Sequence, residues 1–108
     1  MSSRALTAFE AYVQALNRGD VDAAVSAFGA DARIRHRQGT FSDPEAIRRL
    51  IEEIASSESE FTVNRIMSDG NAAMAELRFE GPDGRGHLAA ILIVDDEGGI
   101  RDLALYYR

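Results

Sequence analysis

The apolar residues near the start of the chain recur every three or four positions, and this spacing predicts two consecutive helices. One apolar stripe on the first helix is formed by Phe9, Tyr12, Val13 and Leu16. That helix is expected to end near Gly19. The Asp20 carboxylate can cap the second helix by accepting a hydrogen bond from an unpaired backbone N–H. The apolar side of the second helix is formed by Val21, Ala24, Val25 and Phe28.

After Asp31 the period changes to two, which predicts a short strand. One face of this strand carries the side chains of Ala32, Ile34 and His36, and three arginines at 33, 35 and 37 point from the other face toward water. Residues 39–42 are expected to connect this strand to a third helix. That helix begins at Asp43-Pro44, because the carboxylate can cap it and proline fits the first turn.

From residue 60 onward the alternation has period two in four runs, at 60–67, 72–80, 87–94 and 100–107. In the first run we expect Phe61, Val63 and Met67 to share one face of the strand. The run 87–94 is apolar at every position except His87, which is typical of a strand covered on both sides. Its second face carries Ala89, Ile91 and Ile93. We expect a second copy of the chain to cover that face as a homodimer; the alternative is a loop or terminus folded over it.

The order of elements predicts an α+β fold in which helices cover one face of an antiparallel sheet. The length of 108 residues is that of one domain, spanning 1–108. A net charge of −6 argues against nucleic-acid binding, and the absence of cysteine excludes thiolate chemistry and disulfides. No apolar run is long enough to span a membrane, and the N-terminus lacks a signal-peptide pattern, so we expect no membrane partner and a cytoplasmic location.

The segment ALNRGDVDAAVSAFGADARI at residues 15–34 resembles the opening of the nuclear transport factor 2-like superfamily, in its SnoaL-like and ketosteroid isomerase-like branch. The same superfamily includes limonene epoxide hydrolase. The resemblance implies a cystatin-like α+β roll, with a strongly curved, cone-shaped antiparallel sheet packed against three N-terminal helices. It also implies a hydrophobic pocket inside the cone. Because this fold hosts unrelated activities, it does not by itself assign a function.

The resemblance also suggests two catalytic residues. Tyr12 falls where the isomerases have a tyrosine that donates a hydrogen bond to the enolate oxygen, and His36 falls on the proton-transferring carboxylate. An imidazole can serve as such a base near neutral pH. The second acid of the isomerases is missing, since Ala89-Ala90 stand near its position. The Asp-Arg-Asp arrangement of the epoxide hydrolases does not form around Asp102 either, because neighbouring strand residues are expected to face opposite sides.

These residues support three functional hypotheses. In the first, the protein is an isomerase-like or cyclase-like enzyme for an apolar carbonyl or polycyclic molecule, with His36 as base and Tyr12 as oxyanion donor. In the second it binds such a molecule without catalysis, and in the third it is a dimerising adaptor whose cone is filled by its own side chains. No cofactor or metal is expected, because the two histidines lie on separate strands without a carboxylate pattern. The residues expected to line the pocket are Phe9, Leu16, Ile34, Phe61, Leu77, Phe79, Ala90, Leu103 and Leu105.

Overall fold

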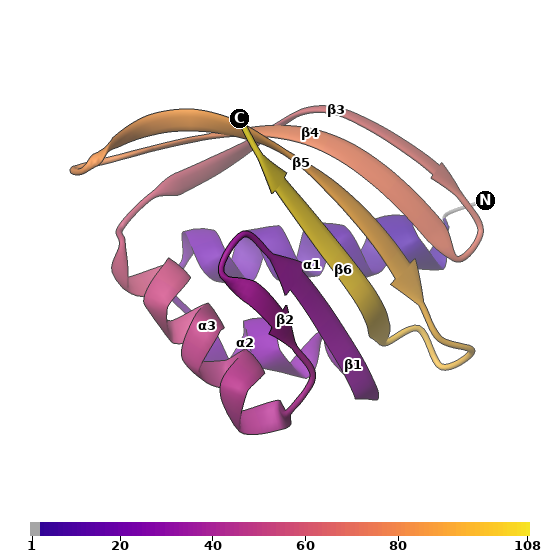
Figure 1. The fold of residues 1–108 in the computed structure, drawn as a ribbon. Coiled ribbons are helices and arrows are strands. Elements are labelled where there is room, and N and C mark those ends of the chain that lie inside the picture. Colours follow the sequence, from indigo (N-terminus) through magenta and orange to yellow (C-terminus); the bar gives the residue numbers. More distant parts are fainter. Residues whose placement is uncertain (1–2) are drawn as a thin grey trace.

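The computed structural model describes residues 3–108, which form three helices and six strands (Figure 1). The helices are α1 (Arg4–Asn17), α2 (Val21–Ser26) and α3 (Pro44–Ser56). The strands are β1 (Phe28–His36), β2 (Gly39–Phe41), β3 (Glu60–Asp69), β4 (Ala72–Gly81), β5 (Gly84–Val94) and β6 (Ile100–Tyr107). The predicted α+β class is confirmed.

The six strands form one sheet in the order β2-β1-β6-β5-β4-β3. In Figure 1 the strands β3, β4 and β5 arch over α1, and β6, β1 and β2 continue the sheet beside α2 and α3. All neighbouring strands are antiparallel except β1 and β6, which are parallel. This pair departs from the expected antiparallel sheet. A long connection through α3 and four further strands separates β1 from β6, so no tight turn forces them to be antiparallel.

The inner face of the curved sheet packs against the apolar stripe of α1. Phe9, Tyr12, Val13 and Leu16 are all buried, as their spacing predicted. No polar or charged residue among 3–108 is classed as buried. We call the space between the sheet and the three helices the cone.

Three local predictions near the first strands are wrong. Phe28 does not belong to α2: it begins β1, where it pairs with Ile100 and its ring meets Tyr12 edge-on with centroids 5.5 Å apart. Residues 39–41 form the strand β2 rather than a simple connection. The Asp43 side chain makes no capping hydrogen bond to α3, although proline does occupy the first turn. In the first two cases, pairing with a neighbouring strand outweighs the local sequence signal.

Met67 also lies on the opposite face from the one predicted. The pairing of β3 with β4 shifts between Val63 and Arg65, which leaves Asn64 as an extra residue in the strand. This β-bulge moves all following residues to the other face. Ile66 therefore packs against the core, and Met67 is 63% exposed.

The outer face of the sheet is open in the described part of the chain. All four exposed large apolar residues lie on it, on strands β3 to β6, namely Met67, Met74, Ile91 and Tyr106. Neither a loop nor a terminus within residues 3–108 buries them. None of the helices in this range is sufficiently long and apolar to traverse a bilayer.

Candidate functional site

The cone contains two hollows of very different size. At its wide end, between α3, the 36–38 turn and the β4–β5 hairpin, lies an open hollow of about 360 Å³ that we call the mouth. Deeper inside, between α1 and the sheet, is a void of only about 20 Å³, which we call the inner void. A void of that size holds about one water molecule. The interior of the cone is therefore filled almost completely by its own side chains, and the space for a ligand is at the mouth.

The chemistry of the mouth centres on His36 and Tyr107. His36 ends β1 and Tyr107 ends β6, so the sheet brings together two residues that are 71 positions apart. The His36 Nε2 atom and the Tyr107 hydroxyl oxygen lie 3.2 Å apart, and the two rings meet edge-on. Tyr107 lines both the mouth and the inner void.

The backbone determines which atom donates in this pair. The Gln38 N–H donates to His36 Nδ1 over 3.3 Å, so Nδ1 is an acceptor and the proton of the neutral ring lies on Nε2. The Nε2–H then donates to the Tyr107 oxygen. That leaves the hydroxyl proton of Tyr107 free to donate to another group. The pair thus presents a hydrogen-bond donor, held in place by the histidine, to the space around it.

Arg37 is the third polar residue at this point. Its guanidinium carbon lies 4.3 Å from the centre of the Tyr107 ring, a cation–π geometry. Arg37 therefore departs from the predicted row of three outward arginines, because the strand ends at His36 and the alternation stops there.

Burial and the Arg37 charge hold the pKa of His36 below its ordinary value, and the Glu53 charge opposes this shift. Burial raises the pKa of Tyr107, and Arg37 opposes that shift. Both groups are consequently neutral near pH 7.

The apolar wall of the mouth is formed by two phenylalanines whose places are set by specific contacts. The Asn17 side chain accepts from the N–H of Phe61 at 2.8 Å and donates to its carbonyl at 2.9 Å, which joins the end of α1 to β3. Phe79 lies over Gly86 on the adjacent strand, where a Cβ atom would come within 2.7 Å of the ring. The Phe79 ring in turn lies 6.0 Å from that of Tyr107.

Tyr12 lies on the inner-void side of Tyr107, whereas His36 lies on the mouth side. Tyr12 lines the inner void and is 4% exposed. Burial, with a smaller effect from Tyr107, raises its pKa far above the ordinary value. His36 does not line the inner void, and Tyr12 does not line the mouth. The two residues suggested as a catalytic pair are thus separated by Tyr107, which the sequence reasoning had not selected.

The residues expected to line a pocket fall into three groups. Phe9, Leu16, Leu77, Ala90 and Leu105 surround the inner void. Phe61 lines both hollows, and Phe79 lines only the mouth. Ile34 and Leu103 are buried in the core and line neither hollow.

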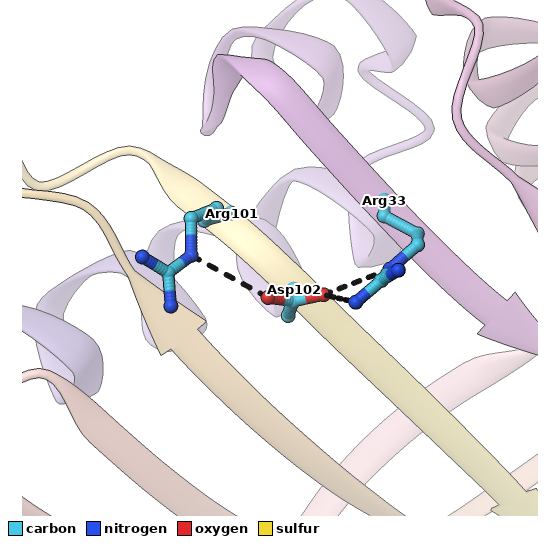
Figure 2. Close-up of polar contacts among 3 residues, drawn as sticks. All are labelled: Arg33, Arg101 and Asp102. Carbon is cyan, nitrogen blue, oxygen red and sulfur yellow. Dashed lines mark hydrogen bonds and ion pairs between the residues drawn. The ribbon is translucent and has the colours of Figure 1, made fainter.

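A separate polar cluster lies on the outer face of the sheet. Figure 2 shows the Asp102 carboxylate between two guanidiniums, 3.0 Å from Arg33 and 3.4 Å from Arg101. Arg101 can reach its neighbour because the β5–β6 pairing shifts just before this point, so the expected strict alternation fails there. The cluster has one carboxylate and two guanidiniums, and it faces away from the cone. It therefore does not form the Asp-Arg-Asp arrangement.

A hollow larger than the mouth, of about 1030 Å³, lies at the opposite end of the molecule, beside the 95–99 turn. Its Asp95 carboxylate is engaged in the turn, where it accepts from the backbone N–H groups of Glu97 and Gly99. Within residues 3–108 there is also no group of three potential metal-ligating side chains. We therefore take the mouth as the candidate site.

A family model described as the SnoaL-like domain matches residues 9–101. Among solved structures, the epoxide hydrolase/cyclase-like enzyme SalBIII, which has a role in pyran ring formation in salinomycin, has a TM-score of 0.85 and 19% identity, covering 94% of this chain and 88% of that chain. An LEH-like epoxide hydrolase from M. tuberculosis has a TM-score of 0.79 and 23% identity, covering 97% of this chain and 83% of that chain. A computationally designed 17-OHP binder has a TM-score of 0.87 and 16% identity, covering 100% of this chain and 93% of that chain. No curated protein sequence matches significantly.

Proposed function

Because the chain belongs to the SnoaL-like domain family, a branch of the nuclear transport factor 2-like superfamily, we propose that it binds a small, largely apolar molecule at the mouth. The apolar body of the ligand packs on Phe61 and Phe79. An oxygen atom of the ligand, such as a carbonyl, accepts a hydrogen bond from the Tyr107 hydroxyl, which His36 orients. Binding without catalysis is the form of this function that the geometry supports best.

The observation that carries this proposal is the direction of the hydrogen bonds around His36. Its Nδ1 accepts from Gln38 and its Nε2–H donates to Tyr107, so both nitrogens are engaged and the free proton belongs to the tyrosine. A volume of about 360 Å³ lies within the range of small-molecule sites. The designed 17-OHP binder, which has a similar fold, supports the proposal.

The test uses two bicyclic probes that differ only at one carbonyl, 1-indanone and indane. We expect 1-indanone to bind more tightly in an amide NMR titration, with the shifts concentrated at residues 36–38, 61, 79 and 107. Tyr107→Phe should remove this preference, which for one hydrogen bond is about 2- to 10-fold in affinity. Tyr106→Phe is the matched control, since the neighbouring ring lies on the outer face and is 54% exposed.

Equal affinity of the wild-type protein for the two probes would refute the hydrogen-bonding role of Tyr107. Shifts confined to residues around the inner void or the 95–99 turn would refute the site itself. An absence of shifts with both probes would favour the alternative of an adaptor with a filled cone.

A second candidate is proton transfer with His36 as the base and Tyr12 as the oxyanion donor. It is favoured by the lowered pKa of His36, which keeps the imidazole unprotonated near pH 7. For this function His36 must give up one of its two hydrogen bonds and a ligand must displace Tyr107 to reach Tyr12. Exchange of the 1-indanone α-protons in D₂O tests it directly: His36→Gln and Tyr12→Phe should each abolish any protein-dependent exchange. Exchange that survives His36→Gln would exclude His36 as the base.

A further inference from the structure

Two arginines from different elements line the mouth. Arg37 lies in the turn after β1, and Arg85 lies on β5 beside the β4–β5 turn. Neither guanidinium takes part in an ion pair within residues 3–108, in contrast to Arg33 and Arg65, which each pair with a carboxylate. Two positive charges therefore line the hollow without a carboxylate partner of their own.

The Arg37 guanidinium lies against the donor that the proposed function uses. Its carbon atom is 4.3 Å from the centre of the Tyr107 ring, which carries the hydroxyl that His36 orients. A guanidinium over an aromatic ring uses its flat face, so the N–H groups at its edge can still donate. The phenol O–H and these N–H groups form a set of donors on one side of the mouth.

The local field at these donors is positive, although the carboxylates of Glu53 on α3 and Asp83 in the β4–β5 turn also line the mouth. Burial lowers the pKa of His36 most, and among the charges Arg37 lowers it by more than Glu53 raises it. Burial raises the pKa of Tyr107, and the charge that acts against this shift is that of Arg37. An acceptor that reaches the Tyr107 hydroxyl therefore meets a net positive field.

We propose that the apolar molecule bound at the mouth carries a carboxylate, which accepts hydrogen bonds from the Tyr107 hydroxyl and the Arg37 guanidinium together. This inference rests on the proposed function and narrows its ligand from any oxygen-bearing apolar molecule to an organic acid. A carboxylate has two oxygens in one plane and can accept from both donors, whereas a ketone has one oxygen. Arg85, on the hairpin side of the mouth, adds attraction at longer range.

Three probes with one scaffold test the preference for negative charge. They are indane-2-carboxylate, the neutral indane-2-carboxamide, and 2-aminoindane, which is a cation at pH 7. In an amide NMR titration the carboxylate should bind about 5- to 20-fold more tightly than the carboxamide, and added NaCl should reduce this ratio. Tighter binding of 2-aminoindane than of the carboxylate would overturn the inference and assign the charge preference to Glu53 and Asp83.

Variants of two arginines locate the source of the preference. Arg37→Gln should lower the carboxylate-to-carboxamide affinity ratio to about one, because the charged donor is lost. Arg37→Lys keeps the charge and should retain part of the ratio, which separates the loss of charge from a folding defect. Arg35→Gln is the matched control, since it removes the same charge from the exposed outer face and should keep the full ratio. A wild-type ratio in Arg37→Gln would overturn the inference.

The inference and the proposed function fail in different ways. If 1-indanone and the carboxamide shift the residues of the mouth but the carboxylate binds no more tightly than the carboxamide, the carboxylate assignment is wrong and the proposed function stands. If no probe shifts residues 36–38, 61, 79 or 107, the ligand site is wrong and the carboxylate assignment fails with it.

Discussion

Tyr106 and Tyr107 are neighbours in β6, yet they lie on two faces of the sheet with different roles. Tyr107 points into the cone, where His36 donates to its oxygen over 3.2 Å and Arg37 covers its ring. Tyr106 points out of the cone and is 54% exposed beside the outward-facing residues of β5. The inner face of the sheet therefore positions a polar group at the mouth, and the outer face exposes apolar side chains. A shift of one residue along a strand exchanges these environments.

The largest expected effect contrasts two neighbouring residues of β5. Leu92 faces the cone and is 1% exposed, while Ile91 faces outward and is 36% exposed. Leu92→Ala should lower the free energy of unfolding by about 2–5 kcal/mol, because it leaves a cavity in the filled interior. Ile91→Ala should cost less than about 1.5 kcal/mol. Urea unfolding at equal, low protein concentration measures both; equal costs would contradict the distinction between the faces.

The alternation that predicts the faces works in unbulged strands and fails at irregularities. In β4 the expected inner residues, Ala73, Ala75 and Leu77, are buried. In β3 the extra residue at Asn64 reverses the faces after it, and nothing in the local sequence marks that position. The helices and their apolar stripes could be predicted because periods of three and four depend on local residues alone.

The partners within the site could be predicted only in part. His36 was placed on an inner face by alternation, but its contact with Tyr107 depends on the parallel pairing of β1 with β6, which joins distant segments. The same alternation places Tyr107 with Leu103 and Leu105 on the inner face, so this signal was present in the sequence. The contribution of Gln38 comes from a backbone N–H, which no residue type reveals. The filling of the cone likewise depends on the packing of many side chains together.

The next effect separates the two tyrosines. Tyr107→Phe removes the hydrogen bond with His36 and should cost about 0.5–1.5 kcal/mol of unfolding free energy. Tyr106→Phe removes an exposed hydroxyl and should cost close to nothing. Thermal or urea unfolding of both variants gives the comparison. If Tyr106→Phe proved as costly as Tyr107→Phe, the hydrogen bond at the mouth would contribute nothing to stability.

Arg35 and Arg37 offer a similar comparison, since Arg35 lies on β1 and Arg37 lies in the turn after it. Arg37→Gln removes the cation over the Tyr107 ring and should cost about 0.5 kcal/mol, because the contact is partly exposed. It should also raise the pKa of His36, since the Arg37 charge lowers it. The Arg35 side chain points outward, so Arg35→Gln should change neither the free energy of unfolding nor the pKa of His36. The His36 ring protons followed by NMR report the pKa; no shift in Arg37→Gln would exclude the electrostatic coupling.

The smallest effect is the pH dependence contributed by His36. Its pKa in the folded state is below the ordinary value of 6.5, so the unfolded chain binds more protons in this range. As the pH falls from 6.5 toward the folded-state pKa, His36 is protonated mainly in the unfolded chain. This protonation lowers the free energy of unfolding. The His36→Gln variant should lose less stability than the wild type between pH 7.5 and 5.5. A larger loss in the variant would mean that the folded protein favours the protonated imidazole.

The location of a bound probe tests the central claim most directly, namely that the ligand site is the mouth of a filled cone. Intermolecular nuclear Overhauser effects between 1-indanone and the isotope-labelled protein would locate it. We predict contacts with the rings of Phe79 and Tyr107 and none with Leu16 or Ala90 in the interior. Contacts with Leu16 and Ala90, or with the outer-face residues Met74 and Tyr106 alone, would contradict the account.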